Sequence, residues 1–401
     1  MEINKCPISN TKESVEYLNL GNIPLVNNLS ETKEESLLCR RFPLSIQIFP
    51  KSSLTCLKEI VEKDDLFLKY FYRSGINKPY LKHCEKMYEY LSRYIDFNSG
   101  DLVADIGGND GSLLLEFKKE NPHLCYINVD CSETFVDINQ EQGIKYIKEY
   151  FDHKTILPYK AKLITSTNVF QHTEPIRSFV QGIERNLSSE GIWCLEFPYL
   201  LVTLMNDNYD QIYHEHIYYY RLKNIIDLLE QEGMKVINVS YHDMHTGTLR
   251  VLSVKKSSLR QPDNTVDSFL NMEKNITMEY CLRWGEKIHK KIEEFKFFIL
   301  DLSKKGNTIA GFGAAAKGCV FLNTCEFDFN TIKFIIDDTV PKQGKFVPGT
   351  GIEVVNREIL KTNQVDYIII LAHNFKEYII ESLKNEYNGK YIIMFPEIKV
   401  I

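Results

Sequence analysis

The chain has 401 residues, of which 44% are hydrophobic, and a formal net charge of −6 at pH 7. One ordinary hydrophobic core does not fill this length, so about two or three domains are expected. The acidic balance argues against nucleic acid or an anionic membrane as the main partner. There is no apolar leader and no run of about eighteen apolar residues, so a soluble, cytoplasmic protein is expected. The 10 cysteines form no C-x-x-C pair, which is typical of reduced thiols.

The first part of the chain predicts a small N-terminal lobe over residues 1–67. Its apolar stretches are short and interrupted by Pro and Gly, which favours irregular structure. A helical period follows between residues 80 and 95, with its apolar residues on one face.

Strand and helix patterns then alternate, which is typical of a parallel sheet covered by helices on both faces. We therefore predict an α/β domain over residues 68–258. Its expected strands span residues 102–106, 126–129, 161–166 and 192–196.

The most informative segment is the turn after the first of these strands. Asp105 leads into the run Gly107-Gly-Asn-Asp-Gly111, and a helix begins at Ser112. Glycines let the backbone approach a ligand closely, and a helix start offers free N–H groups. The carboxylates of Asp105 and Asp110 repel phosphate, and no Lys follows as in a Walker sequence. The turn therefore suits a ligand that carries an amino group or hydroxyls.

The next expected strand ends in another acid, Asp130, about twenty residues further on, where a carboxylate accepts hydrogen bonds from ribose hydroxyls. S-adenosylmethionine offers an α-amino group, a sulfonium and a ribose diol. We therefore predict it as the cofactor, bound by Asp105, Gly107, Asn109, Asp110 and Asp130. A dinucleotide-binding turn and a plain strand-to-helix turn are the alternatives.

The densest cluster of proton-handling groups is the run from Tyr209 to Tyr220, where His214 and His216 flank Glu215. A neutral His suits general-base work near neutral pH. A metal site on the two histidines is the alternative, but no third ligand stands at a diagnostic spacing. The run follows the strand that ends at residue 196, where parallel sheets place their ligands. We therefore interpret it as part of an active site.

Polar groups also follow other strands. Asn168 and His172 come after the strand 161–166 and are expected to face the same crevice. His245 and Arg250 flank a glycine bend, and Arg250 is a candidate for holding a diphosphate or carboxylate. A surface charge is the alternative for Arg250.

The last part of the chain predicts linking helices and a further domain. Residues 259–303 are charged and show helical apolar spacing, so one or two long helices are expected. Residues 304–401 then repeat a strand, a glycine turn and a helix around Gly311–Gly318. We predict a second, smaller Rossmann-like domain there.

Taken in order, these segments resemble the sugar-nucleotide C-methyltransferases of branched deoxysugar biosynthesis, the family that includes mycarose 3-C-methyltransferase. The resemblance covers nearly the whole chain. It is carried by the runs 20–27, 72–74, 106–111, 213–216, 245–250, 311–318, 342–350 and 371–374.

The resemblance implies an N-terminal zinc lobe, a class I S-adenosylmethionine methyltransferase domain and a C-terminal domain that helps to hold a nucleotide sugar. It implies His216 as the general base, with Glu215, Tyr213 and Tyr72 beside it and Asn168 next to the cofactor. The substrate residues that it implies are His172, His245, Arg250, Lys317, Asp337, Lys342 and Asn374.

The departures from the family concern the first lobe. Family members bind zinc through two C-x-x-C pairs, whereas this chain keeps Cys6 and has Ser9, Phe49 and Ser52 at the other positions. One thiolate cannot build a tetrahedral site, so we expect no zinc. Val340 and His373 also differ from the usual Pro and Trp, and neither is expected to touch the chemistry.

The expected reaction is methylation beside the ketone of a nucleotide-linked 4-keto-6-deoxyhexose, with carbon 3 favoured and carbon 5 as the alternative. An O- or N-methyltransferase, a nonenzymatic sugar-nucleotide binding protein and an NAD-dependent oxidoreductase are the alternatives. A monomer is the default expectation.

Overall fold

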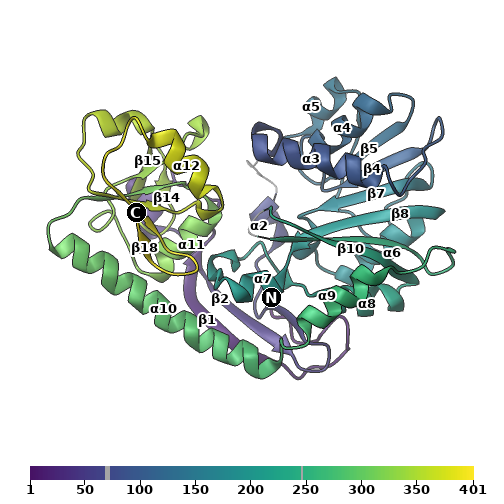
Figure 1. Ribbon diagram of the computed structural model, residues 1–401, viewed down its shortest axis with the longest axis horizontal. Coiled ribbons are helices and arrows are strands. Elements are labelled where there is room, and N and C mark those ends of the chain that lie inside the picture. Colours follow the sequence, from purple (N-terminus) through teal and green to yellow (C-terminus); the bar gives the residue numbers. More distant parts are fainter. Residues whose placement is uncertain (68–72, 245–246) are drawn as a thin grey trace.

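The computed structural model describes residues 1–67, 73–244 and 247–401, and these form three sheets. Figure 1 shows two larger domains, with the N-terminal strands between and below them and a long helix along one side.

The N-terminal lobe is built on a four-stranded antiparallel sheet of order β1-β2-β3-β9. Its strands are β1 (Val15–Pro24), β2 (Arg41–Phe49), β3 (Leu54–Leu57) and β9 (Tyr218–Tyr219). Two short helices, α1 (Lys33–Leu38) and α2 (Lys63–Phe67), accompany it. The lobe is more regular than its Pro and Gly content suggested, because β1 and β2 pair along most of their length despite two bulges.

Cys6 and Ser52, which stand where the resembled family has zinc ligands, lie next to each other in this lobe. The Cys6 thiol lies 3.1 Å from the Ser52 hydroxyl and accepts hydrogen bonds from the backbone N–H groups of Ile8 and Ser9. Cys6 is fully buried. The turn is thus held by hydrogen bonds within the protein. Among the described residues, no group of three or more His, Cys, Asp or Glu side chains is placed to hold a metal ion.

The middle domain contains a seven-stranded sheet of order β10-β11-β8-β7-β4-β5-β6. Its strands are β4 (Leu102–Ile106), β5 (Cys125–Asp130), β6 (Lys145–Lys148), β7 (Ala161–Thr167), β8 (Leu187–Pro198), β10 (Met234–His242) and β11 (Thr248–Lys255). The five strands β4, β5, β6, β7 and β8 are parallel, whereas β11 runs antiparallel to both β8 and β10. The expectation of a wholly parallel sheet was therefore wrong at this edge. The connection between β10 and β11 is too short for the crossover that a parallel pair needs.

Helices cover both faces of this sheet (Figure 1). They are α3 (Lys78–Leu91), α4 (Ser112–Glu120), α5 (Val136–Glu141), α6 (Ile176–Asn186), α7 (Leu200–Met205) and α8 (Leu222–Gln231). With the sheet order, they make this an α/β methyltransferase-type fold.

The C-terminal domain is a second Rossmann-like unit, reached through α9 (Asn264–Glu273) and the long α10 (Met278–Lys304). Its sheet has the order β14-β15-β13-β12-β16-β17-β18. The strands are β12 (Ile309–Phe312), β13 (Ile335–Ile336), β14 (Phe346–Val347), β15 (Ile352–Val355), β16 (Tyr367–Ile370), β17 (Lys390–Ile393) and β18 (Lys399–Val400). Helices α11 (Ala316–Thr324) and α12 (Lys376–Leu383) belong to it.

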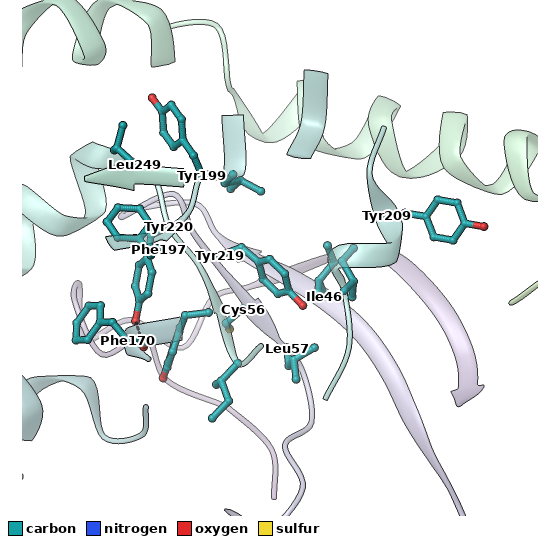
Figure 2. Packing of buried hydrophobic residues seen from close by; sticks show 14 of the residues in the cluster. Ile46, Cys56, Leu57, Phe170, Phe197, Tyr199, Tyr209, Tyr219, Tyr220 and Leu249 are labelled. Carbon is teal, nitrogen blue, oxygen red and sulfur yellow. Dashed lines mark hydrogen bonds between the residues drawn. The ribbon is translucent and has the colours of Figure 1, made fainter. Parts of the chain in front are cut away.

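The aromatic run Tyr218–Tyr220, which includes β9, packs into the core between the first two domains. Figure 2 shows Tyr219 beside Ile46 and Leu57 of the N-terminal sheet. Tyr220 stacks on Phe170 of the middle domain, with ring centroids 5.0 Å apart. Fixing this run on both sides holds the segment just before it, which carries the proton-handling side chains. Within the described ranges, no helix has the length and apolar composition needed to cross a membrane.

Candidate active site

The glycine turn after β4 leaves no space for side chains. At Gly108, an added Cβ would lie 2.6 Å from Oδ1 of Asn128 and 2.8 Å from Oδ2 of Asp105. Gly107 has a φ of +71°, and its Cβ would lie 2.5 Å from Val169. Glycine is thus required here by both conformation and space. The two glycines thus allow the turn to pack closely against Asn128, Asp105 and Val169.

Two carboxylates stand at this turn, the buried Asp105 and the half-buried Asp130. Burial raises the pKa of Asp105 to about 7, and its Oδ1 accepts a hydrogen bond of 2.7 Å from Thr165. Asp130, at the end of β5, accepts hydrogen bonds from the backbone N–H groups of Asn109 and Ser132 at 3.0 and 2.9 Å. Burial also raises the pKa of Asp130. A contact of either carboxylate with S-adenosylmethionine stays a prediction.

Asn109 and Asp110 of the glycine turn make hydrogen bonds to the segment before α3. Oδ1 of Asn109 accepts from the backbone N–H of Ser74, and Oδ2 of Asp110 accepts from Gly75 N–H and from Nε of Arg73. These side chains therefore tie the turn to the segment before α3. A direct contact of either side chain with the cofactor stays a prediction.

Asn168 offers a free acceptor beside the turn. Its Oδ1 is buried and has no hydrogen-bond partner among the described residues. Its φ of +53° is unusual for a residue other than glycine, and its N–H donates to the carbonyl of Glu196 at 3.0 Å. A buried acceptor without a partner is costly unless a ligand satisfies it. This atom supports a ligand at the carboxyl ends of β7 and β8.

His216 is held in a defined tautomer. Its Nδ1 lies 2.9 Å from the carbonyl oxygen of Gln211, and its Nε2 lies 2.7 Å from the hydroxyl of Tyr213. A carbonyl only accepts, so Nδ1 carries the proton and Nε2 of the neutral ring has the lone pair. The rings of Tyr213 and His216 are 4.0 Å apart. The basic atom of His216 is thus paired with a phenol.

Glu215 and His172 lie next to this pair. Burial raises the pKa of Glu215 to about 7, although a hydrogen bond of 2.5 Å from Asn27 opposes the rise. Burial lowers the pKa of His172 to about 4, so its ring is neutral at physiological pH. The His172 ring is 5.0 Å from that of His216, and its Nδ1 lies 2.5 Å from the Glu215 carbonyl. The structure therefore brings four predicted residues into one cluster.

His214 points away from this cluster. Its Nε2 lies 3.3 Å from the carbonyl oxygens of Phe42 and Pro43, whereas His216 turns toward Gln211. Residues 214–216 lie in a turn before β9, so the two rings do not share one side as they would on a strand. The metal alternative for this pair is wrong.

Arg250 is buried, with 1% of its surface exposed, so the surface-charge alternative is also wrong. Its Nε lies 2.5 Å from Oε1 of Glu196, whose Oε2 lies 2.8 Å from Nε2 of His83. Burial by itself would raise the pKa of Glu196. The positive charges of Arg250 and His83 outweigh this effect and lower the pKa to about 2. Sequence reasoning missed this network because its members come from α3, β8 and β11. A contact between Arg250 and substrate stays a prediction.

The four predicted substrate residues of the C-terminal domain fall into two groups. Lys317 and Asn374 lie together, with Nζ and Oδ1 3.2 Å apart, and the charge of Asp210 acts on the lysine. Burial lowers the pKa of Lys317 to about 8. Asp337 and Lys342 instead brace the glycine turn after β12, since both bond to the main chain of Ala314. Only the first group faces the active-site segment.

His373 reaches that segment as well. Its Nε2 lies 2.7 Å from Oδ2 of Asp210, three residues before Tyr213. The C-terminal domain thus packs against the loop that carries Asp210, and the expectation that His373 does not touch the chemistry stays a prediction. Two predicted residues, Tyr72 and His245, lie outside the described residues.

Comparison with known proteins agrees with this architecture. Residues 80–239 match the family "Methyltransferase domain", and residues 243–396 match the family "C-methyltransferase C-terminal domain". The chain is 27% identical over 412 residues to the C-methyltransferase NovU of Streptomyces niveus, covering 100% of this chain and 97% of that protein.

Solved structures match a smaller part of the chain. The mitomycin 7-O-methyltransferase MmcR is 14% identical with a TM-score of 0.36, covering 45% of this chain and 55% of that one. Magnesium protoporphyrin IX methyltransferase of Synechocystis PCC 6803 with bound SAH is 16% identical with a TM-score of 0.36, covering 44% and 83%.

Three observations agree with a methyltransferase: the matches to the two families, the strand order of the middle sheet and the acids around the glycine turn. The chain therefore has an S-adenosylmethionine-dependent methyltransferase domain, followed by a region similar to the C-methyltransferase C-terminal domain.

Proposed function

We propose that this C-methyltransferase acts on a nucleotide-linked 4-keto-6-deoxyhexose and methylates the carbon next to the ketone. The observation that carries the proposal is the tautomer of His216. The Gln211 carbonyl holds the proton on Nδ1 and leaves Nε2 as a base in a buried site. Carbon–hydrogen bonds are acidic enough for such a base only beside a carbonyl, which is why a ketone substrate fits.

In the proposed reaction, Nε2 of His216 takes the proton from the carbon beside the ketone, and the electrons of that C–H bond form an enolate. The Tyr213 hydroxyl, now bonded to Nε2, either gives way to the substrate or relays the proton. Both routes end with the proton on Nε2. The enolate carbon is then the nucleophile for the new carbon–carbon bond.

The enolate oxygen needs a hydrogen-bond donor. Glu215 supports this role because its pKa of about 7 leaves much of it protonated at neutral pH. His172 is neutral and next to His216, so it adds no competing positive charge. Tyr72 is the further donor that the resemblance implies.

S-adenosylmethionine, when bound, supplies an electrophilic methyl group. Asp105, Asp130 and the Gly107–Gly111 turn are the residues that would hold it, and the partnerless Oδ1 of Asn168 would complete the site. The chain's main contribution is to bring the two reactants together in a dry site, which by itself lowers the barrier strongly.

The test is incubation with labelled methyl donor and a panel of nucleotide-linked 4-keto-6-deoxy sugars, followed by location of the label. We expect the methyl group on carbon, at position 3 or 5. The α-proton should also exchange with deuterated water when S-adenosylhomocysteine replaces the donor. A methyl group on oxygen or nitrogen, with no exchange, would instead establish an O- or N-methyltransferase.

A further inference from the structure

We propose that Asn27 of the N-terminal lobe positions the proton of Glu215 for donation to the enolate oxygen. This inference rests on the proposed function, in which Glu215 is a donor to that oxygen. Nδ2 of Asn27 donates a hydrogen bond of 2.5 Å to Oε1 of Glu215, although the two residues are 188 positions apart in the chain. Asn27 acts through Glu215 and needs no contact of its own with the substrate.

The amide of Asn27 decides which oxygen of Glu215 carries the proton. In a neutral carboxyl group the carbonyl oxygen is a better acceptor than the hydroxyl oxygen, so a donor at Oε1 favours the proton on Oε2. Glu215 is buried, with 5% of its surface exposed, so water competes little for Oε1. Asn27 therefore does for Glu215 what the Gln211 carbonyl does for His216, since each selects the tautomer of a buried proton-handling group.

The segment that carries Asn27 is fixed to the C-terminal domain on both sides of this residue. Val26 is buried and Leu29 is partly buried, and both line a narrow gap against the glycine turn after β12. One position further on, Ser30 and Phe346 of β14 exchange two backbone hydrogen bonds of 2.9 and 2.8 Å. Asn27 itself is exposed, so these neighbours, rather than its own burial, hold its amide beside the carboxyl group.

The charges around Glu215 leave the Asn27 hydrogen bond as a strong influence on its proton. Burial raises the pKa of Glu215 to about 7, and the N–H donor of Asn27 acts in the opposite direction because it stabilises the ionised form. The titratable groups nearby are its chain neighbours His214 and His216 and the ring of His172, whose Nδ1 lies 2.5 Å from the Glu215 carbonyl. Burial lowers the pKa of both His172 and His214, so neither ring is charged at neutral pH.

The test compares Asn27→Ala and Asn27→Asp with wild type. Aspartate has the shape of asparagine but no N–H donor, so it removes the hydrogen bond without opening space. The assay measures kcat from about pH 5 to about pH 9 with labelled methyl donor and a sugar nucleotide that the wild type methylates on carbon. Asn28→Ala removes an exposed amide one position further on and is the matched control.

We expect two opposite changes in Asn27→Ala. The kcat of the wild type falls at alkaline pH as Glu215 ionises. Loss of the Asn27 donor raises the pKa of Glu215, so this alkaline limb should move up by at least about half a pH unit. The maximal kcat should fall at least about threefold, because the proton is no longer confined to Oε2. Asn27→Asp should move the limb further, since a second carboxylate disfavours ionisation of the first. Asn28→Ala should keep both the limb and the maximum.

A purely structural role of Asn27 would lower kcat without moving the alkaline limb, so the pH profile separates the two roles. Glu215→Gln cannot ionise and should lack this limb, which assigns the limb to Glu215. The affinity for S-adenosylhomocysteine should stay constant in every variant and reports that the fold is kept. If a variant loses turnover, the infrared band of the protonated Glu215 carboxyl, identified by its loss in Glu215→Gln, should show the same rise in pKa without substrate.

The results that would overturn the inference differ in what else they affect. If the wild type methylates the sugar on carbon and Asn27→Ala has the wild-type limb, Asn27 does not position Glu215, but the proposed function stands. If Glu215→Gln keeps the alkaline limb, Glu215 is not the donor and the inference fails with that assignment. If the wild type methylates none of the sugars on carbon, the proposed function itself is wrong, and the inference with it.

Discussion

Replacement of His216 by Asn is the sharpest test of the catalytic assignment. The Asn side-chain amide can donate to the Gln211 carbonyl in place of Nδ1–H, because it occupies a similar position on the side chain. No atom of Asn replaces Nε2, which lies 2.7 Å from the Tyr213 hydroxyl. The variant therefore keeps the local structure and loses only the base.

The expected loss follows from the role of Nε2. A placed general base contributes about 10²–10⁴-fold, so kcat should fall by this factor, equivalent to ~3–5 kcal/mol in the barrier. The affinity for S-adenosylhomocysteine should not change, since the cofactor acids lie at the other end of the site, on β4 and β5. A loss in kcat with constant affinity identifies an interaction made in the transition state.

The assay combines two readouts. Initial rates with labelled methyl donor give kcat and KM, and the exchange of the α-proton with deuterated water reports deprotonation alone. His214→Asn is the matched control, because this neighbouring imidazole faces Phe42 and Pro43 and points away from His216. We expect its kcat to stay within about tenfold of wild type.

One outcome would refute the reasoning. If His216→Asn exchanges the α-proton at the wild-type rate, the base is elsewhere, and Tyr72 and His172 become the next candidates. If neither protein exchanges, a primary isotope effect on methylation of the deuterated sugar decides whether deprotonation is coupled to methyl transfer.

Three further predictions concern the cofactor, pH and metal. Asp130→Ala should weaken S-adenosylhomocysteine binding at least about tenfold in calorimetry, the effect of a lost charged hydrogen bond, and an unchanged affinity would contradict the cofactor site. Folding raises the pKa of Glu215 from 4.5 to about 7, so stability falls as pH rises between these values. Urea unfolding should show Glu215→Gln gaining stability over wild type from pH 5 to 8, by at most about 3 kcal/mol, and a constant difference would contradict the raised pKa. Elemental analysis should find no stoichiometric zinc, because Ser9, Phe49 and Ser52 replace thiolates; one zinc per chain would show other ligands.

The sequence alone determined the features that depend on neighbouring residues. The turn at Gly107–Gly111 was predicted because glycine conformation and an apolar strand before it are local properties, and β4 begins and ends where expected. The place of Asp130 followed from the spacing of two strands. The segment around His216 was recognised from its density of titratable side chains.

Only the tertiary structure decided which distant groups meet. Asn27 and Glu215 are 188 residues apart in the chain, and Asp210 and His373 are 163 apart, yet each pair is bonded. The pairing of β9 with β3 likewise joins the segment that carries His216 to the first lobe. Such contacts depend on how whole domains pack, and no local pattern encodes the partner of a buried carboxylate. The burial of Glu215, and with it a pKa near neutrality, is therefore a product of packing rather than of the sequence around it.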